Sequence, residues 1–275
     1  MHPFQYTPQH PRVIYKNPPI VERVVSFKGE VSPEAFYGKF DTWRSEVEKS
    51  FPEYDPLQEW SINVQEKDGV PLFENAEPVV HITHRFWKSN QQKKRLCSMR
   101  LLPDQFTINL HREGTDAHRY EDLKKEYEEW LPRWAEHFEV TKFSTVVLDY
   151  VNLLSPAITP HFVKDGRLRV GDMLKVFHNV PGKHVSLIPP YDCGAGLLFH
   201  VDAYCQYVGF VRLLAIPTSS GEPAMRLDLQ LRLHTPTPSL NLHSALTEAD
   251  ILHTLLVDQF EFIFTDEAKE SFGKI

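Results

Sequence analysis

Residues 143–154 read FSTVVLDYVNLL, and this stretch decides how the chain is organised. Its β-branched and aromatic residues predict a strand over Phe143–Leu154. It follows Arg119–Phe138, where large apolar side chains recur at helical spacing and predict a helix. Pro132 lies inside that helix, so we expect a bend or a restart there. Because a strand then opens a similar order of elements again, we predict two halves joined near residues 138–141.

The first half is predicted to begin with a strand over Ile20–Phe27, followed by a helix that Ser32 caps and Pro33 opens. That helix should run to about Ser50, with one apolar stripe made of Phe36, Phe40, Trp43 and Val47. Alternating polarity then predicts an antiparallel meander with strands over Glu59–Gln65, Pro78–Trp87, Arg95–Leu102 and Gln105–His111.

The second half repeats this order with a short helix over Arg169–Phe177 and a final helix. Thr247 and Asp250 resemble a capping box at the start of the final helix, whose apolar face would include Phe262. The strands between are expected over Gly196–Ala203, Tyr207–Ile216 and Met225–His234. We therefore predict an α+β fold of two similar halves related by a pseudo-twofold axis, each an antiparallel sheet with helices packed on one face. The parts are an irregular arm at residues 1–19 and the halves 20–140 and 141–275.

Composition excludes wholesale disorder and disfavours large polyanionic partners. The 275 residues are 41% hydrophobic, and their formal net charge is −7. A chain of this charge repels phosphate backbones as a whole, although a local basic patch remains possible. No stretch reaches the roughly 20 apolar residues of a membrane span, and no targeting segment is recognisable, so we expect a cytoplasmic protein. The odd number of cysteines predicts reduced thiols rather than disulfides, at Cys97, Cys193 and Cys205.

No catalytic or metal motif stands out. His81 and His84 are three residues apart on a predicted strand, where they point to opposite faces and cannot share an ion. His200 and Asp202 could share a face, but a catalytic zinc needs a third protein ligand. We therefore predict no metal and no cofactor. Paired acids on the predicted helices are interpreted as solvated side chains, at Glu128, Glu129, Asp258 and Glu261.

The densest basic run is predicted to form the tip of a hairpin. Its cations beside Phe86-Trp87 could contact nucleic acid, at Lys88, Lys93, Lys94 and Arg95. The simpler interpretation is that these lysines keep an exposed hairpin soluble.

Three polar residues interrupt apolar strands. Asp149 and Asn152 would need partners if buried, so we interpret them as structural hydrogen-bonding groups at the join between halves. Asp228 alternates with leucines on a polar strand face, which favours a solvated carboxylate with basic neighbours.

Residues Tyr15–Glu22, with the sequence YKNPPIVE, resemble the opening of an uncharacterised, sporadically distributed bacterial family whose members begin with an N-P-P-I-x-E block. Further similarities are Leu148–Asn152, where the family usually has a basic residue in place of Asp149, Leu252-His253, Phe260 or Phe262, Thr265-Asp266 and Phe272-Gly273. The resemblance implies no known activity. Its patchy distribution is similar to that of accessory proteins in mobile or anti-phage gene clusters.

The leading hypothesis is a non-catalytic scaffold subunit that binds a protein encoded nearby, in a bacterial multi-component, anti-phage defence system. Its partner-binding residues would lie in and after the arm, at Tyr15, Asn17, Pro18 and Glu22. The alternatives are a nucleic-acid sensor or nuclease accessory subunit that uses the basic hairpin, and an unrecognised hydrolase with His81 or His200 as base. A second copy of the chain is a further possible partner.

Overall fold

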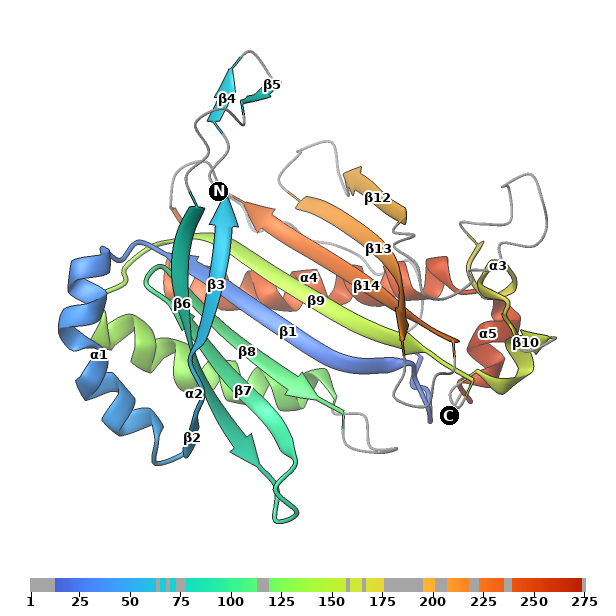
Figure 1. The fold of residues 1–275 in the computed structure, drawn as a ribbon, viewed down its shortest axis with the longest axis horizontal. Helices are drawn as coiled ribbons and strands as arrows, with labels where there is room; N and C mark the ends of the chain where they lie inside the picture. Colours follow the sequence, from blue (N-terminus) through green and yellow to red (C-terminus); the bar gives the residue numbers. More distant parts are fainter. Residues whose placement is uncertain are drawn as a thin grey trace.

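A ten-stranded antiparallel sheet runs through the molecule in the computed structural model (Figure 1). The strands are β1 Ile20–Gly29, β2 Glu53–Tyr54, β3 Leu57–Ile62, β4 Gln65–Lys67, β5 Val70–Leu72, β6 Pro78–Ser89, β7 Arg95–Leu102, β8 Gln105–His111, β9 Phe143–Leu154, β10 Val163–Lys164, β11 Arg167–Leu168, β12 Ala195–His200, β13 Tyr207–Pro217 and β14 Pro223–His234. The helices are α1 Pro33–Val47, α2 Tyr120–His137, the 3₁₀ turn η1 Pro160–Phe162, α3 Val170–Met173, α4 Leu242–Ile263 and α5 Asp266–Ser271. The structure describes residues 13–62, 65–67, 70–72, 78–112, 119–156, 159–164, 167–175, 195–200, 207–217, 223–234 and 239–273.

The strand order is β12-β13-β14-β9-β1-β8-β7-β6-β2, and β3 also pairs with β6. β1 and β9 lie antiparallel in the middle, with Val24 opposite Asp149. The two halves therefore share one continuous sheet, where the sequence predicted one sheet in each half. The physical reason is that β1 and β9 each have two sheet edges, and pairing them satisfies the backbone groups that separate halves would expose.

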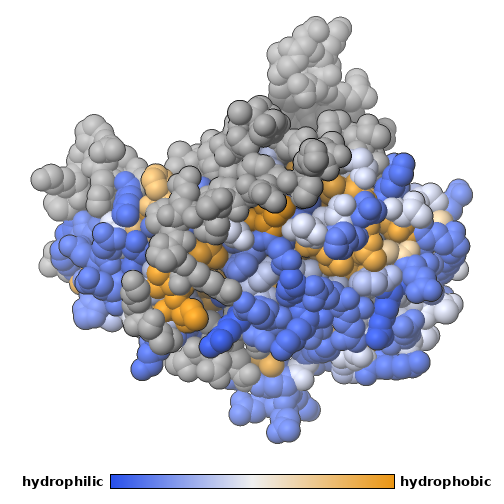
Figure 2. Space-filling view, turned by 180° about the vertical axis from the view of Figure 1, so that it is seen from behind, coloured by the Kyte–Doolittle hydropathy of each residue, from blue (hydrophilic) through white to orange (hydrophobic). Residues whose placement is uncertain are grey.

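Helices α2 and α4 cover one face of this sheet. α2 contacts β1 and β8, and α4 contacts β9 and β14. Alternate strand residues point into this layer, so Phe27, Ile108, Leu148 and Leu231 are buried there. The opposite face is turned toward the viewer in Figure 1 and is called the open face below. The strand residues that alternate with the buried ones point to this face, and most of them are polar. Seen from behind, described hydrophilic residues cover much of the lower surface, and hydrophobic patches emerge beside them (Figure 2).

The first helix forms as its sequence predicts. Ser32 Oγ accepts a hydrogen bond from the Ala35 amide at 3.1 Å, which caps the helix N-terminus. The apolar stripe from Phe36 to Val47 is buried, and it packs against both β6 and α2, with Phe40 on Phe86 and Trp43 on Trp130. α2 is also confirmed, but it continues through Pro132 without a restart. Burial of Trp130 and Trp134 on either side of the proline outweighs the single hydrogen bond that its ring removes.

The C-terminal helix begins six residues earlier than the capping-box pattern indicated. Asn241 Oδ1 accepts from the Ser244 amide at 2.8 Å and is the actual cap. Thr247 lies inside α4, where its hydroxyl donates to the His243 carbonyl at 3.0 Å. The prediction that Phe262 lies on the apolar face of this helix was also wrong. Phe262 is 58% exposed, whereas Phe260 packs in the core. A short further helix, α5, follows α4.

Candidate functional site on the open face of the sheet

The predicted partner-binding residue Tyr15 is used within the chain itself. Its hydroxyl donates to Glu261 Oε1 at 2.7 Å, and its ring packs against Phe260 and Phe272. Burial and then the Glu261 carboxylate raise the pKa of Tyr15 above its ordinary value. The prediction that Asp258 and Glu261 are solvated is wrong, since both are buried, whereas Glu128 and Glu129 are exposed as expected.

The rest of the described N-terminal segment is also bound to the body of the protein. The Asn17 amide donates to the Phe272 carbonyl at 2.9 Å. Pro18 is buried, and its carbonyl accepts from Arg112 Nη1 at 2.6 Å. Residues 13–19 are therefore an irregular segment attached to the body, and residues 1–12 lie outside the described part. Glu22, in contrast, points to the open face.

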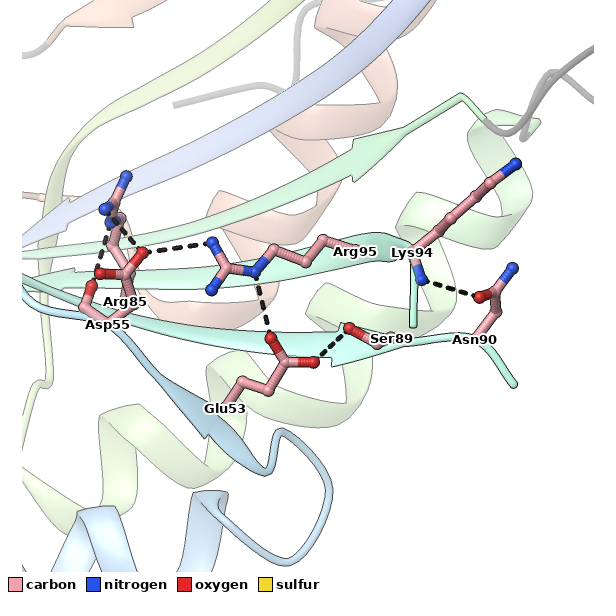
Figure 3. Close-up of polar contacts among 7 residues, drawn as sticks. All are labelled: Glu53, Asp55, Arg85, Ser89, Asn90, Lys94 and Arg95. Atoms are coloured by element: carbon pink, nitrogen blue, oxygen red, sulfur yellow. Dashed lines mark hydrogen bonds and ion pairs between the residues drawn. The ribbon is translucent and has the colours of Figure 1, made fainter. Parts of the chain in front are cut away.

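Acidic neighbours neutralise Arg95 of the basic hairpin (Figure 3). Arg95 pairs with Glu53 at 3.1 Å and with Asp55 at 3.3 Å. Asp55 also accepts from Arg85 Nη2 at 2.9 Å, and Glu53 accepts from the Ser89 hydroxyl. The predicted nucleic-acid residue Arg95 is thus part of an ion-pair cluster.

The three predicted lysines of the hairpin divide into two kinds. Lys88 Nζ pairs with Glu126 at 2.7 Å and lies over the Phe51 ring, so it faces the helix layer. Lys93 and Lys94 are exposed at the turn and form no ion pair with a described residue. Only two of the four predicted nucleic-acid residues therefore offer a free charge.

The candidate bases do not form a recognisable active site. His84 is buried, with its Nδ1 2.7 Å from the Tyr54 hydroxyl, and burial and then Arg44 lower its pKa. Cys97 is a buried free thiol whose pKa is raised by burial. The side chains of His81 and His200 lie outside the described residues, as do Cys193, Asp202 and Cys205. Within the described ranges, no three His, Cys, Asp or Glu side chains are placed to hold a metal ion.

The middle of the open face carries two groups of charged side chains, one on each side of β9. On β1, Glu22 Oε1 accepts from Asn109 Nδ2 at 2.5 Å and lies 3.6 Å from Arg100 Nη2. On β14, Asp228 accepts from Arg212 at 2.6 Å and from Arg226 at 2.6 Å. Asp228 is only 2% exposed, so the prediction of a solvated carboxylate was wrong, while the basic neighbours were predicted correctly.

Asp149 lies between these two groups and forms no ion pair with a described residue. Gln230 Nε2 approaches Oδ2 at 3.5 Å, and buried Oδ1 has no hydrogen-bond partner. Burial, and then the charge of Asp228, raises the pKa of Asp149 to about 7. Asn152 does have the predicted structural role, because its Nδ2 donates to the carbonyls of Tyr150 and Leu227 at 3.0 and 3.1 Å.

A separate polar cluster on the helix side ties the halves together. Lys124 of α2 pairs with Asp250 of α4 at 2.6 Å, and the Tyr120 ring stacks on His253 at 3.8 Å. His253 Nδ1 also lies 2.6 Å from the Tyr150 hydroxyl. These contacts connect α2, α4 and β9, so we assign them a structural role.

Among the described residues, Asp149 is thus a carboxyl group on the open face that lacks a counter-ion, and we take its surroundings as the candidate site. The sequence singled out Glu22, Asp149 and Asp228 separately and missed Arg100 and Asn109. Their positions at alternate residues of polar strand faces were the only signal available.

No protein-family model matches the chain, and the comparisons with curated proteins and with solved structures found no similar protein. The resemblance of Tyr15–Glu22 to a bacterial family therefore stays a prediction. No helix in the described ranges is both long enough and apolar enough to span a membrane.

Proposed function

We propose that this chain is a non-catalytic protein-binding subunit. The observation that carries the proposal is a row of side chains on one face of β6 that continues from the core to the protein surface. Phe86 and His84 are buried, but Ile82 and Val80, next on the same strand face, are 43% and 41% exposed. Tyr37 of α1, which contacts His84, is 49% exposed. Exposed apolar groups that continue a core row are typical of protein-interaction surfaces.

The occupant we propose is a partner protein that buries aliphatic or aromatic side chains against this β6 row, defined by Tyr37, Val80 and Ile82. We place it in a cytoplasmic bacterial multi-component system, such as anti-phage defence, in line with the family that Tyr15–Glu22 resembles. We further propose that the two halves arose by duplication about a pseudo-twofold axis. Strand order supports this, because β1-β8-β7-β6 and β9-β14-β13-β12 run outward from the middle in the same connectivity.

The test is co-purification of the tagged chain with the products of adjacent genes. Val80→Asp combined with Ile82→Asp should reduce capture of such a partner at least tenfold, because burying unpaired carboxylates in the interface costs free energy. Phe262→Asp is the control, since Phe262 is also an exposed apolar residue but lies on α4. Capture that survives the β6 change, or is lost equally in the control, would refute the proposal. Thermal unfolding of each variant checks that the fold persists.

The nucleic-acid alternative depends on Lys93 and Lys94, because Lys88 and Arg95 are engaged in ion pairs. Its test is binding of a labelled DNA or RNA duplex at several salt concentrations. If the hairpin binds nucleic acid, Lys93→Glu with Lys94→Glu should abolish binding together with its salt dependence.

A further inference from the structure

We propose that the open face binds the guanidinium group of an arginine side chain at Asp149. This site lies apart from the β6 row, and it rests on the proposed function only for the source of the arginine, a segment of the partner protein.

The geometry places unpaired acceptors on both sides of one valine. Asp149 on β9 and Asn109 on β8 are both directly opposite Val24 of β1. Asp149 Oδ1 and Asn109 Oδ1 are buried and have no hydrogen-bond partner within the described chain. Glu22, two residues from Val24 on the same strand face, adds a second carboxylate. A ligand over Val24 would therefore meet unpaired acceptors from two strands, β8 and β9, with the paired carboxylate of Glu22 beside them.

Acceptors of this kind call for a donor-rich cation. Neighbouring strands lie about 4.8 Å apart, so the backbones that carry Asp149 and Asn109 are about 10 Å apart. A single metal ion holds its oxygen ligands at about 2.3–2.6 Å and suits a tighter cluster. A guanidinium has five N–H donors in a planar fork and can reach acceptors on opposite sides.

The floor of the site suits the aliphatic part of an arginine. Val24, Val147 and Val151 surround Asp149 on the open face, and Val151 is buried while the other two are half-buried. The methylene stem of an arginine can pack on such valines while its charged end reaches a carboxylate. An ammonium on a shorter or more polar carrier would gain less from this floor.

The neighbouring carboxylates are already paired, which leaves Asp149 for the ligand. Asp228 is held by two arginines, and Glu22 is held by Asn109 and Arg100. The charged groups that face Asp149 on the open face from β1 and β14 are Glu22, Arg226, Asp228 and Arg232. Since the pKa of Asp149 is about 7, its ionised fraction rises about tenfold between pH 6 and pH 8. Arginine binding should therefore be about tenfold tighter at pH 8.

The test uses the whole chain and a small probe, N-acetyl-argininamide, with N-acetyl-citrullinamide as its neutral isostere. By calorimetry or NMR titration at pH 8, we expect saturable binding of the arginine probe and at least tenfold weaker binding of the citrulline probe. Asp149→Asn should weaken arginine binding at least tenfold and remove its pH dependence. Glu128→Gln, an exposed carboxylate on α2, is the control and should leave binding unchanged.

Equal binding of both probes, no binding of either, or unchanged binding by Asp149→Asn would overturn the arginine site. These outcomes are independent of the β6 row. If the probe fails while partner capture still requires Val80 and Ile82, the protein-binding function stands and only this site is wrong. If the probe binds as expected but capture of the partner is unaffected by Val80→Asp with Ile82→Asp, the proposed function is wrong and the arginine site stands.

Discussion

Replacing Asp149 with asparagine should change how the stability of the protein depends on pH. The carboxyl titrates near pH 7 in the folded chain and near its ordinary pKa of 3.8 when unfolded. Between these values the folded state keeps a proton that the unfolded state has lost. The free energy of unfolding therefore falls as pH rises through this window and becomes level above pH 7.

The size of the effect follows from the shift. About three pKa units correspond to about 4 kcal/mol, and about 2.5 kcal/mol of this lies between pH 5 and pH 8. With about 2.1 cal/mol/K of unfolding entropy per residue, a chain of this length would lose about 4 °C in Tm over that range. Asparagine has no proton to lose at this position, so the Asp149→Asn variant should lack this component.

Urea unfolding of wild type and Asp149→Asn at several pH values between 5 and 8 measures the difference directly. We expect the variant to gain about 2.5 kcal/mol relative to wild type across the series. Asp228→Asn provides the contrast, because it removes the partner of Arg212 and Arg226 and should destabilise by about 1–3 kcal/mol at pH 8. Parallel pH profiles for wild type and Asp149→Asn would show that the carboxyl is solvated or paired, and would refute the reasoning.

Three further predictions concern contacts away from this site. Tyr15→Phe should lower the free energy of unfolding by about 1–2 kcal/mol in urea, because Glu261 loses its hydroxyl donor; no loss would mean that the segment is not attached in solution. Ser32→Ala should cost about 1 kcal/mol through the lost helix cap, and an unchanged midpoint would contradict the cap. Lys88→Ala should cost about 1 kcal/mol, whereas Lys93→Ala should stay within about 0.5 kcal/mol, and equal effects would contradict the division of the hairpin lysines.

Local pattern was enough to predict most elements of this fold. The strand over Phe143–Leu154 and the helix that Ser32 caps depend on neighbouring residues alone, and both were predicted correctly. The start of α4 was wrong because Asn241 and Thr247 are both acceptable caps. Which one is used depends on how much of the helix packs against β9 and β14, and that is a tertiary property.

The candidate site could not be assembled from the sequence for a related reason. Glu22, Asp149 and Asp228 are far apart in the chain, and they meet only because β1, β9 and β14 are adjacent strands. The burial of Glu261 likewise depends on Tyr15, which is 246 residues away. Sequence reasoning identified the polar residues but could not tell which of them would be paired.

The central position of β1 and β9 has a consequence for the first half as an isolated piece. A fragment that stops at the join would present β1 as a bare edge, with its backbone donors and acceptors unpaired. Two such fragments could pair their β1 strands antiparallel about a twofold axis and rebuild the middle of the sheet from two molecules. Covalent linkage to the second half supplies that pairing within one chain and protects it from self-association.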